Sequence, residues 1–236
     1  MLLAVAGKGG VGKSLLSGTL ARVLARRGRR VLALDSDPLP GMSFVLGVEP
    51  PEVPALIAAV ERGENRRWRY VAGVGAVRAV QRYSIDAPDG VRLFQIGKQA
   101  VGTWAQHDAS VNAFYLTVHR LEHAKAFRDW VILGDMPAGG RQLANDWAPY
   151  ANHFLVVAEA TCQSMMTARR IIRIAGARPE ARVSLVVSKA TGEDDVRRVS
   201  DFLDLEPLAV VPVDEDVRIA ERAGVAILDH APQSAT

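Results

Sequence analysis

Residues 7–14 of this chain read Gly-Lys-Gly-Gly-Val-Gly-Lys-Ser. The octet matches the pattern G-x-x-x-x-G-K-[ST], in which backbone N–H groups of a glycine-rich loop surround phosphate oxygens and a following helix adds its positive N-terminus. Lys13 is expected to neutralise charge on the β- and γ-phosphates, and the Ser14 hydroxyl is expected to ligate Mg²⁺. The predicted phosphate-binding residues are Gly7, Gly9, Gly10, Val11, Gly12, Lys13, Ser14 and Leu15.

The residues on either side of the octet have the pattern that such a loop requires. Residues 2–6 form a short apolar run suited to a buried strand, and residues 15–27 have helical periodicity. Because strand, loop and helix follow in the order that the motif needs, a chance match is the weaker interpretation.

Length and composition predict a single α/β domain over residues 1–236. The chain is 49% apolar, which is ample for a core, and no segment approaches the length of a membrane span. It begins directly in the first expected strand, which leaves no room for a signal peptide, and its single cysteine, Cys162, excludes an internal disulfide. We therefore expect a cytoplasmic location.

Short apolar runs alternate with helical segments along the rest of the chain. We expect strands at residues 30–34, 91–96, 130–133, 154–158, 183–187 and 208–211. We expect helices at 51–62 and 110–126, a loop at 41–47, and β-like stretches at 70–80. The alternation predicts a doubly wound, mostly parallel sheet flanked by helices, with ligands at the carboxyl ends of the strands.

Carboxylates follow two of the expected strands. Asp35 and Asp37 come after the second strand in the segment Asp-Ser-Asp-Pro, and Asp135 comes after the run at 130–133. At that edge of the sheet, one carboxylate can help to hold Mg²⁺ and another can orient a hydrolytic water. The alternative interpretation for each is an ordinary turn.

The octet carries a second lysine, Lys8, directly after Gly7, and in this form it resembles the deviant Walker A motif of the MinD, ParA and CooC family of P-loop NTPases. The resemblance implies ATP and Mg²⁺ as ligands, slow ATP hydrolysis, and a nucleotide-dependent homodimer in which Lys8 reaches the partner's phosphates. From its chemistry alone, Lys8 is either a second ammonium group near the triphosphate or a solvated loop lysine.

Two further segments resemble the switch regions of that family. By this match, Asp37 would position the attacking water, so that the catalytic residues are Lys8, Lys13 and Asp37. Asp35 would support the metal together with Ser14 and Asp135. In the segment Gly-Asp-Met-Pro-Ala-Gly that begins at residue 134, Gly139 could offer its N–H to the γ-phosphate.

Recognition of the base rests on weaker matches. Ser188 stands where relatives often carry asparagine, and Pro212 and Asp214 belong to a segment that resembles the loop around adenine. These positions could equally be ordinary core and loop, so the choice of ATP over GTP depends mainly on the resemblance.

Within the family, the resemblance is greatest to CooC-type ATPases of metallocentre maturation. These carry a Cys-x-Cys pair in a region where this chain has residues 102–108 and no cysteine, so metal binding by that route is in doubt. His107 with Asp108, or His119 with His123 at helical spacing, are weak substitutes as ligands. Cys162 begins an expected helix and, as a lone cysteine, is expected to be a packing residue.

Two functions follow from the sequence. The first is a CooC-like maturation factor that acts on a protein client, and the second is a ParA- or MinD-like positioning ATPase. Arginine clusters at residues 26–30, 66–69 and 169–173 keep nucleic-acid binding possible but not favoured. No membrane binding is expected, because residues 228–236 are short, polar and interrupted by proline.

Overall fold

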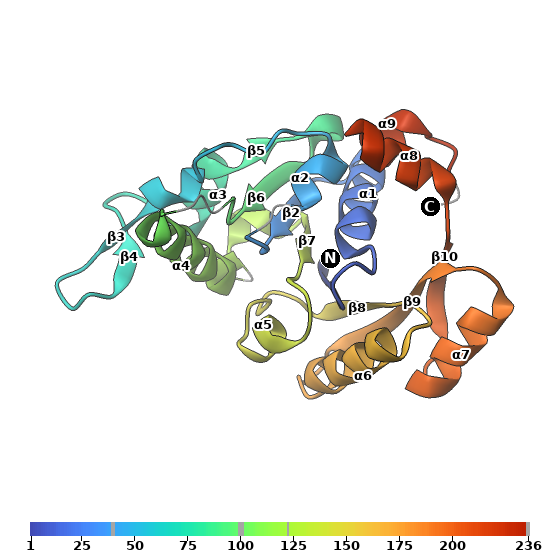
Figure 1. Cartoon of the computed structure of the whole chain (residues 1–236). Helices are drawn as coiled ribbons and strands as arrows, with labels where there is room; N and C mark the ends of the chain where they lie inside the picture. Colours follow the sequence, from blue (N-terminus) through green and yellow to red (C-terminus); the bar gives the residue numbers. More distant parts are fainter. Residues whose placement is uncertain (39–40, 99–101, 122, 235–236) are drawn as a thin grey trace.

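The computed structural model describes residues 1–38, 41–98, 102–121 and 123–234. Its main sheet has eight strands in the order β10-β9-β8-β1-β7-β2-β6-β5, and every neighbouring pair is parallel except β5 with β6 (Figure 1). These strands are β1 (Leu2–Gly7), β2 (Val31–Asp35), β5 (Ile85–Asp86), β6 (Arg92–Gln95), β7 (Val131–Asp135), β8 (His153–Ala158), β9 (Arg182–Ala190) and β10 (Pro207–Pro212). The predicted doubly wound, mostly parallel sheet is confirmed.

Helices flank the sheet on both faces. The α-helices are α1 (Lys13–Arg26), α2 (Gly41–Leu46), α3 (Ala76–Tyr83), α4 (Trp104–Leu121), α5 (Arg141–Ala144), α6 (Cys162–Gly176), α7 (Glu193–Leu203), α8 (Glu215–Ala223) and α9 (Ile227–His230). Three 3-10 helices are η1 (Ala55–Ala59), η2 (Pro88–Gly90) and η3 (Lys125–Phe127), and a separate hairpin joins β3 (Val60–Arg62) to β4 (Trp68–Tyr70). In the described part of the chain, no helix combines the length and apolar character needed to cross a membrane.

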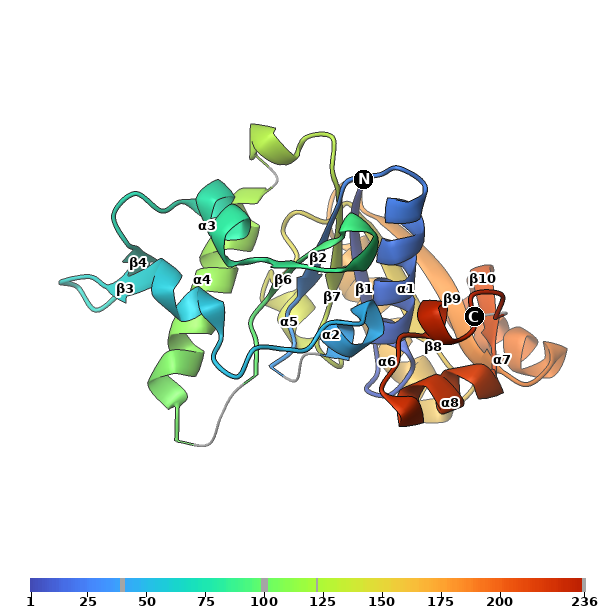
Figure 2. The same cartoon turned by 90° about the horizontal axis from the view of Figure 1, so that it is seen from above.

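The alternation of side chains along β1 divides the core into two layers. Leu3 and Val5 belong to the layer that contains residues of α1 and α2, whereas Ala4 and Ala6 belong to the layer that contains residues of α4 and α6. This is the pattern of a central strand covered on both faces, because successive side chains point to opposite sides. Figure 1 shows α1 and α6 on opposite sides of the strands, and Figure 2 gives the view from the α1 side.

Two predictions for the segment between the second and third long strands are wrong. Residues 41–47 form mostly helix α2 rather than a loop. Contacts with distant residues stabilise this short helix, because the carboxylate of Asp35 accepts the Met42 N–H and Val45 packs closely on Gly18 of α1. Residues 51–62 form η1 and then β3 instead of one helix, because Val60 pairs with Tyr70 across the small hairpin.

Two more element boundaries differ from the predictions. The β-like stretch at 70–80 gives way to helix α3 from Ala76, which buries Ala79 and Val80 and leaves Arg78 exposed. Helix α4 begins at Trp104, before the predicted residue 110, and ends at Leu121. Packing of one face of each helix against the core decided the secondary structure of these segments, since their local sequence patterns were short or ambiguous.

A buried arginine of α1 forms ion pairs with the C-terminal helix α9 and with η2. Arg22 is 2% exposed and donates through Nε to Asp89 (2.6 Å) and through both Nη atoms to Asp229 (2.6 and 2.7 Å). Asp89 belongs to η2 and Asp229 to α9. These contacts hold α9 and η2 beside the C-terminal half of α1.

Candidate functional site

The predicted phosphate loop lies between β1 and α1. Gly12 precedes the helix with φ +91°, a left-handed conformation that favours glycine. A Cβ at Gly7 would lie 2.5 Å from the carbonyl oxygen of Val157 on β8, so a side chain has no room there. The backbone therefore requires glycine at both positions, as the motif predicted.

Lys13 lies inside the loop. Its side chain is nearly buried, and its Nζ donates to the carbonyl oxygen of Lys8 (3.1 Å). Burial lowers the pKa of Lys13 from its ordinary value, while the charges of Asp135 and Asp37 oppose that effect. The ammonium group is thus held at the centre of the loop beside two carboxylates.

Ser14 and Asp135 meet beside Lys13, although they are far apart in the sequence. The Ser14 Oγ donates to Asp135 Oδ2 (2.5 Å), because α1 begins against the end of β7. Asp135 is 2% exposed, and its Oδ1 has no hydrogen-bond partner among the described residues. Burial raises the pKa of Asp135 to about 6, against the effects of Ser14 and Lys13.

Asp35 is the neighbouring carboxylate, at the end of β2. It is fully buried and accepts the backbone N–H groups of Asp37 (3.0 Å) and Met42 (3.1 Å). Burial, followed by the nearby Asp135, raises the pKa of Asp35 to about 8. Asp37 follows two residues later and is partly exposed at the start of the next loop.

Gly139 closes the loop that follows β7. It has φ +86°, and its N–H donates to the carbonyl oxygen of Gly7 (2.9 Å). In this conformation the N–H that was expected to face a γ-phosphate is used within the protein. Contact with a phosphate at this position would require an exchange of that hydrogen bond.

The residues predicted for base recognition lie around one apolar cavity of about 440 Å³. Ser188 and Asp214 line it, together with Leu15 and Val213, whereas Pro212 ends β10 next to it. The Ser188 Oγ donates to the Val11 carbonyl (2.7 Å), so this side chain supports the phosphate loop directly. Asp214 caps α8 by accepting the Asp216 N–H (2.9 Å).

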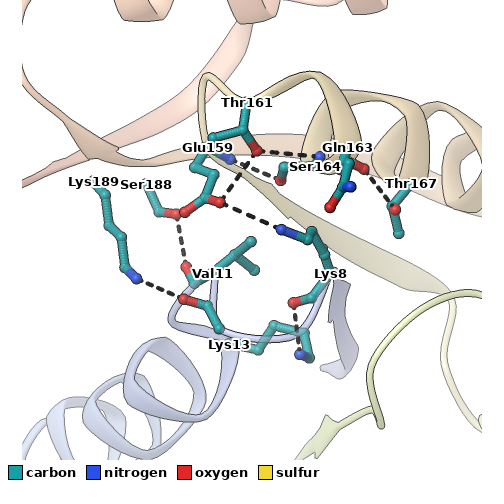
Figure 3. A network of polar contacts seen from close by, with 11 residues as sticks. Lys8, Val11, Lys13, Glu159, Thr161, Gln163, Ser164, Thr167, Ser188 and Lys189 are labelled. Carbon is teal, nitrogen blue, oxygen red and sulfur yellow. Dashed lines mark hydrogen bonds and ion pairs between the residues drawn. The ribbon is translucent and has the colours of Figure 1, made fainter.

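Two residues near the loop were not predicted as part of the site. Lys189 has φ +55° and donates its Nζ to the Gly10 carbonyl (2.6 Å). Glu159 lies 3.9 Å from the Lys8 ammonium, and this ion pair is drawn with the loop contacts in Figure 3. The available signal was their position: Glu159 directly follows β8, which pairs with β1, and Lys189 lies near the end of β9, the next strand of the sheet.

The structure does not support the histidine pairs as metal ligands. Helix α4 ends at Leu121, so His123 lies beyond it and does not share a helical face with His119. Asp108 is engaged by Arg62 (2.7 Å) and by the Trp68 indole (3.0 Å). Within the described ranges, no group of three or more His, Cys, Asp or Glu side chains is arranged for a metal ion.

The prediction for Cys162 is only partly correct. It begins α6, as expected, but its side chain is exposed and does not pack in the core. The preceding residue, Thr161, is the N-cap, so Cys162 is the first residue of the helix.

Comparisons with known proteins agree with this geometry. A family model described as the CobQ/CobB/MinD/ParA nucleotide binding domain matches residues 2–227. The chain is 30% identical over 233 residues to an uncharacterised ATP-binding protein of Methanocaldococcus jannaschii, covering 95% of this chain and 90% of that protein. It is 27% identical over 246 residues to the carbon monoxide dehydrogenase accessory protein CooC of Rhodospirillum rubrum, covering 98% and 91%.

Solved structures share the fold at lower identity. The septum site-determining protein MinD of Pyrococcus horikoshii, complexed with Mg-ADP, has a TM-score of 0.73 at 18% identity, covering 99% of this chain and 90% of that one. A ParA family ATPase of Chlorobium tepidum has a TM-score of 0.74 at 18% identity, covering 99% and 93%. With a phosphate loop at β1, carboxylates at the ends of β2 and β7, and a family match over nearly its whole length, the chain belongs to the CobQ/CobB/MinD/ParA family of nucleotide-binding domains.

Proposed function

We propose that this chain is an ATPase that binds ATP with Mg²⁺, dimerises around the nucleotide, and acts as an accessory or maturation factor on a protein client. The observation that carries the proposal is the different placement of its two loop lysines. Lys13 is nearly buried inside its own loop, whereas the Lys8 ammonium faces outward beside Glu159. An outward ammonium on a phosphate loop suits a phosphate that a second subunit presents.

The inner carboxylates fit a Mg²⁺ site. The buried Asp135 Oδ1 has no hydrogen-bond partner among the described residues, and Ser14 and Asp35 lie on either side of this carboxylate. Hydroxyl and carboxylate oxygens are the ligands that Mg²⁺ accepts, directly or through water. When bound, Mg²⁺ would offset negative charge on the phosphate oxygens.

The protein groups around the proposed Mg²⁺ site have separate roles in the proposed hydrolysis. Lys13 would hold the β- and γ-phosphates, and Asp37, at the partly exposed start of the loop after β2, would orient the attacking water. The Gly139 N–H would leave the Gly7 carbonyl when a γ-phosphate is present and return to it after hydrolysis. This exchange would make the loop after β7 sensitive to the nucleotide state.

The apolar cavity next to the loop supports a bound base. It is lined by Leu15, Val213 and the aliphatic parts of α8, with Ser188 and Asp214 as its polar groups. Such a lining fits a flat aromatic ring held by a few polar contacts. Adenine is our proposal for that ring because one sequence relative is named as an ATP-binding protein.

A protein client is the proposed target because of the similarity to CooC, whose name describes it as an accessory protein. This chain has a single cysteine, and residues 104–108 begin helix α4, with Asp108 bonded to the β3–β4 hairpin. A thiolate site for metal delivery in that region is therefore not part of the proposal.

The proposal is tested by measuring mass by light scattering with a non-hydrolysable ATP analogue and Mg²⁺. We expect a shift from monomer to dimer for the wild type, and a dimer that persists with ATP itself for Asp37→Ala, because that variant would bind but not hydrolyse. Lys8→Ala should bind nucleotide yet remain monomeric, whereas Lys13→Ala should lose binding. A wild type that stays monomeric, or identical behaviour of the two lysine variants, would contradict the proposal.

One observation favours a second candidate, a positioning ATPase that binds DNA. The β3–β4 hairpin projects from the body of the molecule (Figure 1) and carries four exposed arginines. These are Arg62, Arg66, Arg67 and Arg69, of which Arg62 pairs with Asp108 and Arg69 with Glu61. ATP-dependent, salt-sensitive binding to duplex DNA that is lost in Arg66→Ala/Arg67→Ala would favour this candidate over the first.

A further inference from the structure

The two lysines of the phosphate loop have different partners. The Lys13 Nζ donates to the Lys8 carbonyl oxygen (3.1 Å), on the inner side of the loop. The Lys8 Nζ lies on the other side, 3.9 Å from Glu159 Oε1, with side-chain exposures of 33% for Lys8 and 19% for Glu159. Figure 3 shows the two ammonium groups directed away from each other.

The fold brings Glu159 next to the loop. It directly follows β8, and β8 pairs with β1 so that Val157 is opposite Gly7. The first residue beyond the end of β8 therefore lies beside the second residue of the glycine-rich loop. The Glu159 side chain reaches the Lys8 ammonium from this position because the pairing of β8 with β1 fixes the Glu159 backbone there.

The Glu159 carboxylate is also held in place by its own neighbours. Its backbone N–H donates to Ser164 Oγ (3.1 Å), and the Thr161 hydroxyl donates to Glu159 Oε1 (3.2 Å). Thr161 in turn accepts the Ser164 N–H (3.3 Å) as the N-cap of α6. This closed set of contacts presents the carboxylate at the positive end of a helix and toward Lys8.

We propose that Glu159 is a positioning residue that holds the Lys8 ammonium outside the chain's own phosphate site and competes with phosphate for it. The inference rests on the proposed function, in which Lys8 serves the phosphates of a second copy. Because an ammonium group that contacts a carboxylate must leave it to contact a phosphate, the ion pair lowers the apparent affinity of the ATP-bound dimer. Glu159 thereby sets the nucleotide and protein concentrations at which dimerisation occurs.

The test measures dimerisation of the single and double variants by analytical ultracentrifugation with ATPγS and Mg²⁺. Glu159→Gln keeps the size of the side chain and an oxygen that can accept from Thr161, but removes the charge. Since a part-exposed ion pair is weak, we expect the dimer dissociation constant to fall about two- to fivefold in Glu159→Gln. Lys8→Ala is expected to be monomeric, and adding Glu159→Gln to it should not restore the dimer.

A matched control removes a carboxylate elsewhere. Glu206 is exposed and precedes β10 at the end of the sheet remote from the loop, so Glu206→Gln should leave dimerisation unchanged. A thermal melt of each variant establishes that it is folded. A dimer of unchanged or weaker affinity in Glu159→Gln, or a dimer that Glu159→Gln restores in the Lys8→Ala background, overturns the inference while leaving the proposed wild-type dimer intact.

The failure of the proposed function gives a different result. If the wild type remains monomeric with ATPγS, the homodimer is refuted, and the affinity of the monomer for ATPγS becomes the readout for Glu159. A tighter monomer complex in Glu159→Gln that depends on Lys8 supports competition between Glu159 and phosphate within one chain. An unchanged affinity overturns the inference as well.

Discussion

Lys13 and Lys8 belong to one loop, yet they lie in two different environments. Lys13 forms part of an inner group with Ser14, Asp35 and Asp135, whose charged side chains are nearly buried and lie at the ends of β1, β2 and β7. Lys8 belongs to an outer group with Glu159 and Lys189, whose side chains are partly exposed.

The difference between the groups concerns how readily their contacts can exchange. Buried charges that lack water depend on one another, so the loss of one partner is costly. Exposed ion pairs are weak and are replaced by water at little cost. We therefore assign binding of the nucleotide and metal to the inner group, and contacts that change with nucleotide state to the outer group.

The largest expected effect is on the inner group. Lys13→Ala removes the charge nearest to the expected phosphates and leaves Asp135 and Asp37 without it, so nucleotide affinity should fall about 100-fold, or about 3 kcal/mol. Isothermal titration with Mg-ADP measures the change. Lys125→Ala, at an exposed lysine of η3, is the control and should bind as the wild type does; a similar loss in both variants would refute the assignment.

The inner carboxylates should make the nucleotide-free protein less stable as pH rises. Burial and Asp135 raise the pKa of Asp35 from 3.8 to about 8, so between these values the folded chain keeps a proton that the unfolded chain has lost. The free energy of unfolding should therefore decrease between about pH 4 and pH 8, the range in which only the folded chain keeps this proton.

Chemical denaturation of the wild type and of Asp35→Asn at pH 5 and pH 8 tests this effect, because the variant lacks the titrating group. The loss of stability between the two pH values should be smaller in Asp35→Asn. It should also shrink in the wild type when Mg-ADP is present, since a metal ion favours the ionised carboxylate. An equal loss in both proteins would show that Asp35 does not cause it.

The smallest expected effect concerns the outer group. Lys189→Ala removes the donor to the Gly10 carbonyl, so the loop loses one external support and nucleotide affinity should fall about three- to tenfold. Lys8→Ala should change the affinity of the monomer about twofold or less, because the Lys8 ammonium faces away from its own site. Titration of the monomer below the concentration of dimerisation compares the two; a loss in Lys8→Ala as large as that in Lys13→Ala would remove the distinction between the groups.

Much of the site could be predicted because its residues follow strands with strong apolar patterns. Asp35 and Asp135 each end a parallel strand, and such ends meet at one edge of the sheet. The predictions were wrong for residues 41–47, 51–62 and 70–80, because these segments are short and take their structure from contacts with distant parts of the chain. Helix α2 is the clearest case, since its support includes the Asp35 carboxylate and the packing of Val45 on α1.

The order of amino acids alone was sufficient for the glycine-rich loop between a strand and a helix, the central strands and the family, because these depend on local spacing, glycine conformations and apolar periodicity. The sequence includes Lys8 and Glu159, but it does not show the direction of the Lys8 side chain or the contact between the two residues. Those depend on β8 pairing with β1, which brings residues about 150 positions apart together. The folded sheet decides which strand ends are neighbours. It thereby separates a buried lysine that would hold its own phosphates from a partly exposed lysine beside Glu159.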